Sequence, residues 1–132
     1  MLNVEKRYFD FTTFPILIAL LIVAFWIRID NLGLLCFQSD EGIEAIAVQG
    51  ILEHGLPIVD SGIFYGRWPL YLYLQGAFTW FFSLNEFWMR LPSVIFGVMT
   101  IIPGFILGKT LFNKYIGLLT AIIITFSVWN IE

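Results

Sequence analysis

The sequence predicts an all-α integral membrane protein. Hydrophobic residues make up 59% of the 132 residues and charged residues only 13%, whereas soluble domains have about 45–50% apolar and roughly 25% charged residues. Apolar runs long enough to cross a bilayer recur along the chain. Residues 68–84 are rich in Trp and Tyr, which prefer the headgroup level of a membrane. Together these observations indicate lipid as the solvent.

Three apolar segments are predicted to cross the bilayer, at about residues 11–28, 91–108 and 115–130. A hydrocarbon core of about 30 Å needs roughly 17–25 helical residues. The first segment ends in Trp26 and Arg28 rather than in a small-residue cleavage site, so we expect an uncleaved span and not a secretory signal. In the second, GFILG at 104–108 matches the small-xxx-small pattern of packed membrane helices.

The charges of the loops predict the topology. If residues 68–84 cross the membrane, the short loop with Lys109 and Lys114 faces outside, against the positive-inside rule. If they lie in the interface instead, these lysines share the cytoplasmic side with the basic residues near the N-terminus. We therefore expect three spans, a cytoplasmic N-terminus and one outer loop of about residues 30–90 that holds juxtamembrane helices.

Residues 40–54 of this loop are predicted to form a short amphipathic helix on the outer leaflet. Its apolar positions repeat at helical spacing, with Glu44 and Gln49 on the other sides: Ile43, Ile46, Ala47, Gly50 and Ile51. Gly55 followed by Pro57 is a helix stop signal. The helix is too short to span the membrane.

Asp40 and Glu41 are adjacent acids at the predicted start of this helix. Acids there satisfy free N–H groups and oppose the helix dipole, worth up to about 1 kcal/mol each. A capping box places its acid three residues after the cap. Because Glu41 directly follows Asp40, that box leaves the second acid unexplained. Capping and chemistry stay open as alternatives at this point.

Arg67 and Arg90 each precede an apolar segment. Each is either an interfacial anchor, whose side chain reaches toward the headgroups, or a cation for a lipid phosphate, which a guanidinium binds through two N–H groups. The residues around Arg90 do not separate these two interpretations.

Several other functions find no support in the sequence. The net charge is −3 with no cluster of Lys and Arg, which argues against nucleic acid as a partner. His54 has no second His or Cys at ligand spacing, so no metal is indicated. No cofactor is expected, because nucleotide-binding fingerprints are absent from the sequence. Cys36 is the single cysteine, which excludes an intrachain disulfide.

Six segments follow one another in a recognisable order over nearly the whole chain. They are SDEG (39–42), AVQGILEHGLP (47–57), YGRWPLYLYL (65–74), NEFWMRLPSVIFG (85–97), LGKTLFNKYIGLLTA (107–121) and FSVWNIE (126–132). In this order they resemble the N-terminal part of GT-C superfamily glycosyltransferases. These membrane enzymes use polyprenyl-phosphate-linked sugars and include protein O-mannosyltransferases and aminoarabinose lipid A transferases.

The resemblance implies roles for particular residues. Asp40 corresponds to the general base, and Glu41 to a partner that positions the acceptor or shapes the site. Arg67, together with Tyr65 and Arg90, corresponds to the group that binds the donor and its lipid phosphate. The sequence departs from the family pattern by having Trp68 where a proline is common, Gly66 where an acid is, and Val128 and Asn130 in place of a Pro and a His.

The implied activity is transfer of a sugar from a polyprenyl-phosphate donor to a hydroxyl of a lipid, glycan or protein. It takes place on the extracytoplasmic face of a multi-pass protein, with a prokaryotic cytoplasmic membrane expected. Family members have several hundred residues, so we expect this chain to be the N-terminal portion of such an enzyme and inactive alone. The alternative is a non-catalytic small membrane protein or assembly subunit, for which the GFILG packing pattern is the support.

Overall fold

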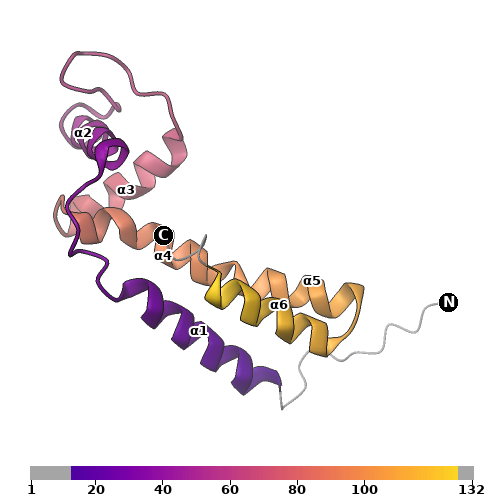
Figure 1. The fold of residues 1–132 in the computed structure, drawn as a ribbon. Coiled ribbons are helices and arrows are strands. Elements are labelled where there is room, and N and C mark those ends of the chain that lie inside the picture. Colours follow the sequence, from indigo (N-terminus) through magenta and orange to yellow (C-terminus); the bar gives the residue numbers. More distant parts are fainter. Residues whose placement is uncertain (1–12, 128–132) are drawn as a thin grey trace. The chain divides into compact units, whose positions relative to one another are not determined.

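A computed structural model describes residues 13–127 of the protein, and this part of the chain is helical, as predicted (Figure 1). The helices are α1 (Thr13–Ile29), α2 (Ser39–His54), α3 (Pro69–Phe81), α4 (Glu86–Met99), α5 (Ile101–Leu111) and α6 (Lys114–Phe126). The β-structure within this range is one isolated antiparallel bridge, between Ile58 and Phe64. The chain divides into two compact units: Ile29–Ile95, and the described residues before and after that segment.

Helices α4 and α5 follow each other directly and form a 26-residue apolar helix, Glu86–Leu111. They are separated at Thr100, three residues before Pro103, because a proline ring lacks an N–H donor and disfavours the helical turn before it. Helical hydrogen bonds continue across this point, from Thr100 N–H to Phe96 O (3.0 Å) and from Gly104 N–H to Thr100 O (3.1 Å). A helix of this length extends about 39 Å, enough to cross a hydrocarbon core of about 30 Å.

The structure supports the three predicted spans to different degrees. The span predicted at 91–108 lies within the 26-residue helix. Helices α1 and α6 are apolar, but they have only 17 and 13 residues in the described part of the chain. The spans predicted at 11–28 and 115–130 extend beyond this described part, residues 13–127. Over residues 13–127, one helix rather than three is therefore long and apolar enough to cross a membrane.

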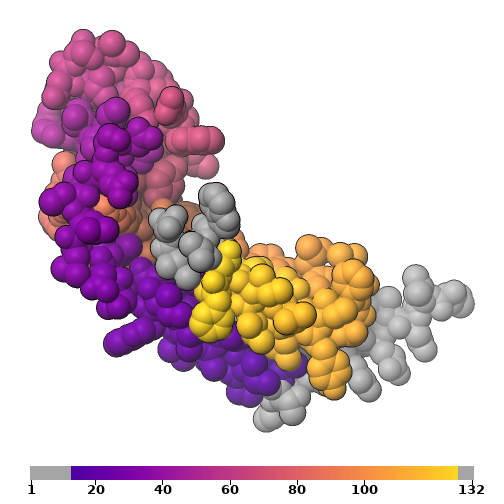
Figure 2. Space-filling model, in the orientation of Figure 1, coloured from indigo at the N-terminus to yellow at the C-terminus, as the bar shows by residue number. Residues whose placement is uncertain are grey.

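The first unit is built from α1, α5 and α6. Helices α5 and α6 run side by side (Figure 1), and the side chains of α6 lie against those of α5 and α1 (Figure 2). Buried apolar residues of all three helices make up the core: Leu17, Ala24, Ile101, Phe105 and Ala121. Two alanines among five core residues allow the helices to approach closely.

Glycines bring α5 and α6 into contact, which confirms the packing role predicted for GFILG. A Cβ atom placed on Gly104 would lie 2.3 Å from Cδ1 of Ile124. One placed on Gly108 would lie 2.9 Å from Cα of Gly117 on the opposite helix. Since real Cβ atoms do not approach backbone atoms this closely, a larger residue at Gly108 would force the helices apart, whereas one at Gly104 would first displace the end of the Ile124 side chain.

This unit buries polar residues as well as its apolar core, and it exposes large apolar side chains. Its buried residues include Thr13, Arg28 and Thr125, while large apolar side chains such as Ile22 (63% exposed) and Trp26 (72%) face outward. The Arg28 guanidinium, only 3% exposed, donates to the carbonyl oxygens of Ala24 (3.1 Å), Ile124 (3.0 Å) and Thr125 (3.2 Å). Exposed apolar surface on this scale indicates a lipid or protein partner.

The second unit contains α2, α3 and the beginning of α4. Its buried core is apolar: Ala45, Ala47, Val48, Leu72 and Met89. The connection after α2 is closed on itself by the bridge between Ile58 and Phe64, and its backbone at Ile58 lies against that helix. Gly50 permits this approach, because a Cβ there would lie 2.3 Å from the Ile58 carbonyl oxygen.

The helix predicted at 40–54 is confirmed as α2, Ser39–His54, but its orientation differs from the prediction. Gly55 ends the helix in the left-handed conformation (φ 77°) and donates its N–H to Ile51 O, as the stop signal indicated. Ile43, expected on the buried face, is exposed, whereas Glu44, expected on the polar side, is half-buried. The buried residues of α2 are Ala45, Ala47, Val48 and Gly50, and its isoleucines are at most partly buried.

Helix α3 also turns its polar residues inward. It buries Leu72, Gln75, Gly76 and Thr79 and exposes larger apolar residues: Leu70 (86%), Trp80 (70%) and Phe81 (79%). Its 13 residues extend about 20 Å, which is short of the hydrocarbon core of a bilayer.

Gly117→Ala should destabilise the first unit, because the new Cβ would lie 2.8 Å from the Phe105 carbonyl oxygen and 2.9 Å from the Lys109 nitrogen, both backbone atoms. We expect a loss of about 1–3 kcal/mol, as for other overpacked sites, measured by denaturant unfolding in detergent micelles. Gly42→Ala is the matched control, since open space surrounds Gly42 and alanine favours a helix. Equal stability of the two variants would contradict the glycine contact.

Candidate functional site

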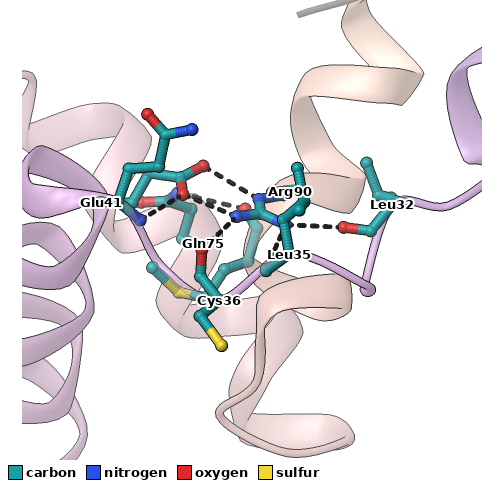
Figure 3. Close-up of polar contacts among 8 residues, drawn as sticks. Leu32, Leu35, Cys36, Glu41, Gln75 and Arg90 are labelled. Atoms are coloured by element: carbon teal, nitrogen blue, oxygen red, sulfur yellow. Dashed lines mark hydrogen bonds and ion pairs between the residues drawn. The ribbon is translucent and has the colours of Figure 1, made fainter.

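The strongest polar contact in the second unit joins Arg90 of α4 to Glu41 of α2 (Figure 3). The guanidinium Nε donates to Oε1 of Glu41 at 2.9 Å, and Nη2 donates to Oε2 at 2.7 Å. Paired, nearly parallel bonds of this kind are the strong geometry for arginine and a carboxylate. Both side chains are partly shielded from solvent, at 18% and 37% exposure.

The remaining N–H groups of Arg90 hold the segment between α1 and α2. Nη1 donates to the carbonyl oxygens of Leu32 (2.8 Å) and Leu35 (3.0 Å), and Nη2 also donates to that of Cys36 (3.4 Å). All five donors of the guanidinium therefore have acceptors. A left-handed residue, Asn31 (φ 63°), begins the turn that presents these carbonyl groups.

Glu41 also caps the N-terminus of α2. This corrects the expectation that a capping box leaves Glu41 unexplained. The N-cap is Gln38 rather than Ser39 or Asp40, so Glu41 occupies the third helical position and accepts the Gln38 backbone N–H at 3.1 Å. The hydrogen bond from Arg90 is the main cause that lowers the pKa of Glu41; burial opposes it and the Gln38 N–H adds to it. Glu41 is thus held as a carboxylate.

Asp40 and Arg67, the predicted base and phosphate ligand, are exposed. Neither makes a hydrogen bond or ion pair with another residue of the described range, so no direct contact joins them. Tyr65 is half-buried and packs against the core of the second unit, with its N–H bound to Pro57 O at 2.8 Å. Trp68 beside Arg67 is 71% exposed. The structure therefore leaves both charged groups free for a ligand.

A second polar group lies between α3 and α4. The Tyr71 and Ser93 hydroxyl groups are hydrogen bonded, and burial is the main cause that raises the pKa of Tyr71. One turn along α3, Gln75 is 4% exposed and donates its Nε2 to Met89 O at 3.1 Å. Its Oε1 is buried without a partner. Figure 3 shows Gln75 beside the pair of Arg90 and Glu41.

Glu44 is a candidate that the sequence analysis placed on the polar side of α2. Its half-buried carboxylate makes no hydrogen bond or ion pair to the other residues described. Burial is the main cause that raises the pKa of Glu44, and the charges of Glu41 and Asp40 raise it further. The sequence contains one signal for this arrangement, the spacing of the acids. Glu44 follows Asp40 by four residues and Glu41 by three, which places the three acids at neighbouring positions on a helix surface.

A cavity of about 240 Å³ lies near the other end of α2, and the sequence-predicted site residues do not line it. Its lining residues are Ile46, Gln49, Gly50, Glu53, His54, Ile58, Val59, Asp60 and Gly62. Within residues 13–127, the structure has no cluster of three or more His, Cys, Asp or Glu side chains arranged to hold a metal ion.

The chain was compared with protein-family models, with curated proteins and with solved structures, and no match was found. Over residues 13–127, the fold and the site define a helical protein with one long apolar helix and a polar site around the start of α2. The likeness to GT-C glycosyltransferases rests on the sequence segments alone.

Glu41→Gln should weaken the second unit by about 1–2 kcal/mol, the range for a part-exposed, charge-assisted contact. Because the folded-state pKa of Glu41 is lowered, its contribution is present above the unfolded value near 4.3 and is lost as the pH falls through that value and the folded one. Denaturant unfolding in micelles, followed by helical circular dichroism from about pH 7 to 3, measures both effects.

The control for this variant is Glu53→Gln, in the same helix. Glu53 is exposed, and its polar partners among the residues of the described range are Gln49 and His54, so its replacement should change stability by less than about 0.5 kcal/mol. One result would show that Glu41 is not the titrating group. It is a free energy of unfolding that falls between pH 7 and 3 as steeply in Glu41→Gln as in the wild type.

Proposed function

We propose that this chain takes part in the transfer of a sugar from a polyprenyl-phosphate donor to a hydroxyl acceptor at the extracytoplasmic membrane face. We further propose that it is the N-terminal portion of a GT-C-type glycosyltransferase. The support is the order of the six sequence segments together with a helical fold whose exposed surface is strongly apolar. The donor and acceptor are chemical classes here, a lipid-linked sugar and an alcohol.

We place the second unit, Ile29–Ile95, at the outer leaflet. The support comes from α3, which exposes Leu70, Trp80 and Phe81 while it buries Gln75 and Thr79. A helix of this polarity is suited to the boundary of the acyl chains. A lipid-linked donor enters an active site from this boundary, so a site at the start of α2 would lie at the same level as its substrate.

The single observation that carries the proposal is the different environment of the two adjacent acids. Glu41 is committed to Arg90 and to the helix N-terminus. Asp40 is exposed and makes no hydrogen bond or ion pair to another described residue. A carboxylate without such a partner is available for a substrate, and we assign Asp40 the role of general base.

The proposed reaction needs little beyond a base and a cation. The acceptor oxygen bonds to the anomeric carbon and loses its proton to Asp40, which lies at the start of α2. The bond from that carbon to the phosphate oxygen breaks, and its electron pair leaves with the polyprenyl phosphate. The leaving phosphate is already a weak base, so it needs a positive charge rather than a proton.

Arg67 is the proposed source of that charge. Its guanidinium is exposed, beside the exposed Trp68, and is free to bind phosphate oxygens in pairs. Tyr65 is proposed to position this segment, because it packs on the core of the second unit. Arg90 differs from Arg67 in that all its donors are engaged, so we assign it the role of a positioning residue.

Asp40→Asn should lower the turnover number of transfer by about 100-fold or more, the typical contribution of a general base. Arg67→Ala should raise the KM for a prenyl-phosphate sugar, and Arg67→Lys should raise it less, because a lysine keeps the positive charge. Transfer is measured by mass spectrometry of glycosylated alcohol, in membranes of cells that produce the complete enzyme of which this chain is the proposed N-terminal portion. Unchanged turnover in Asp40→Asn would remove Asp40 from the mechanism.

The competing proposal, a non-catalytic membrane subunit, makes the opposite prediction for the same variants. The observation in its favour is the apolar exterior of the first unit, which a partner protein could cover as well as lipid. In that case the variants at Asp40 and Arg67 keep full function, and the protein purifies in a stable complex. Neither residue makes a hydrogen bond or ion pair with another described residue, and helical circular dichroism of each variant separates a loss of transfer from unfolding.

The proposed topology predicts different labelling at two exposed positions, Ser83 and Phe112. In a protein with Cys36 replaced by serine, Ser83→Cys should react from outside with a membrane-impermeant maleimide, and Phe112→Cys should not. If residues 68–84 cross the membrane instead, Phe112→Cys reacts from outside and Ser83→Cys does not. Permeabilised cells, in which both positions react, provide the control.

A further inference from the structure

The cavity of about 240 Å³ in the second unit has no part in the proposed transfer. One wall comes from α2, between residues 46 and 54, and the other from the connection after this helix, between residues 58 and 62. A water molecule takes about 30 Å³ in the liquid. The volume therefore suits a ligand the size of a small metabolite or of a lipid headgroup.

Backbone contacts give the cavity its shape. Gly50 lets the connection lie against α2, since a Cβ there would lie 2.3 Å from the carbonyl oxygen and 2.8 Å from the nitrogen of Ile58. Beyond Ile58 the connection forms a hairpin, in which Val59 N–H donates to Ile63 O at 3.0 Å. Gly62 turns this hairpin in the left-handed conformation (φ 77°) and donates its N–H to Val59 O at 2.8 Å. The fold therefore forms the cavity without a ligand.

Two carboxylates from different walls line the cavity, Glu53 of α2 and Asp60 of the connection. Gln49 Nε2 donates to Glu53 Oε1 at 2.8 Å, and His54 Nε2 lies 3.7 Å from Glu53 Oε2. Asp60 makes no hydrogen bond or ion pair with another residue of the described range. The described lining includes no Lys or Arg, so a positively charged ligand complements it.

The remaining lining favours an organic cation over a metal ion. Within residues 13–127, Glu53, His54 and Asp60 do not form a cluster that could hold a metal ion. Apolar side chains, such as Ile46 and Val59, line other parts of the cavity. Ligand sites usually combine such apolar walls with a few polar groups. An ammonium group has three N–H donors and no acceptor, which matches two carboxylates.

We propose that this cavity binds a small organic ammonium, with its charged group held by Glu53 and Asp60 and its carbon atoms against the apolar wall. A primary ammonium is offered both by a phospholipid headgroup and by a soluble amine. Ile63 (65% exposed) and Phe64 (57%) continue the hairpin beyond the cavity and would contact the chains of a lipid. The binding needs no sugar transfer, so this inference does not rest on the proposed function.

Binding of a soluble amine is measured on the full chain in dodecyl maltoside micelles, with ethanolamine as the probe. The protein carries glutamate labelled with ¹³C at the carboxyl group, and the Glu53 resonance is the one that Glu53→Gln removes. We expect ethanolamine to shift this resonance. Ethylene glycol, in which a hydroxyl replaces the ammonium, should need a concentration about 10-fold higher or more, because hydrogen bonds between charged groups are stronger.

Asp60→Asn should weaken ethanolamine binding about 3- to 10-fold, the range for one charge-assisted contact near the surface. The matched control is Asp30→Asn, which removes the same charge from an exposed residue outside the cavity and should leave the affinity unchanged. Helical circular dichroism confirms that each variant is folded.

The source of the ammonium is tested in nanodiscs of phosphatidylglycerol, with and without phosphatidylethanolamine. A shift of the Glu53 resonance by phosphatidylethanolamine, reduced in Asp60→Asn, assigns the cavity to a lipid headgroup. A shift by ethanolamine in micelles, with no effect of phosphatidylethanolamine, assigns it to a soluble amine. Either result supports the ammonium site.

Three results would overturn the proposal. The first is the absence of a shift with both ethanolamine and phosphatidylethanolamine, or equal ethanolamine affinity in Asp60→Asn and the wild type. The second is equal affinity for ethanolamine and ethylene glycol, which would show that the charge is not recognised. The third is displacement of ethanolamine by Mg²⁺ at lower concentration, which would make the cavity a metal site. Since no transfer activity is measured, none of these results bears on the proposed function.

Discussion

The second unit depends on the guanidinium of Arg90. Its five donors reach Glu41 at the start of α2 and three carbonyl groups of the segment between α1 and α2. A planar fork with fixed directions sets the positions of all these acceptors at once. A lysine would supply three donors on a flexible stem and could not hold both the carboxylate and this segment. The start of α2, and with it the position of Asp40, follows from this one side chain.

In the bilayer location proposed for it, the first unit obeys a different constraint, because apolar side chains gain little by leaving lipid for a protein interior. Its helices therefore meet through small residues, such as Gly108 and Gly117, and its large side chains face outward. Polar groups must then be satisfied inside the bundle. Arg28 achieves this with carbonyl groups near the end of α6, where a helix leaves its last acceptors free.

Local features of the structure could be predicted from the sequence, and long-range ones could not. The extent of α2, its stop at Gly55 and the glycine contact in GFILG follow from rules that act within a few residues. The partner of Arg90 lies 49 residues away, and no local pattern indicates it. The burial of Glu44 was missed for a related reason: the face of α2 that is buried depends on what packs against it, and small residues rather than isoleucines admit the loop at Ile58.

The different environments of Asp40 and Glu41 arise from where α2 begins. Successive helical residues point about 100° apart, so two adjacent acids cannot both face Arg90. With the N-cap at Gln38, the third helical position is Glu41, and this acid both caps the helix and meets the arginine. Asp40 is left pointing elsewhere, and Glu44, one turn later, is adjacent to both on the helix surface. A helix that began one residue later would move Glu41 out of the capping position, so the start of α2 determines which carboxylate is left without a partner and available for the proposed chemistry.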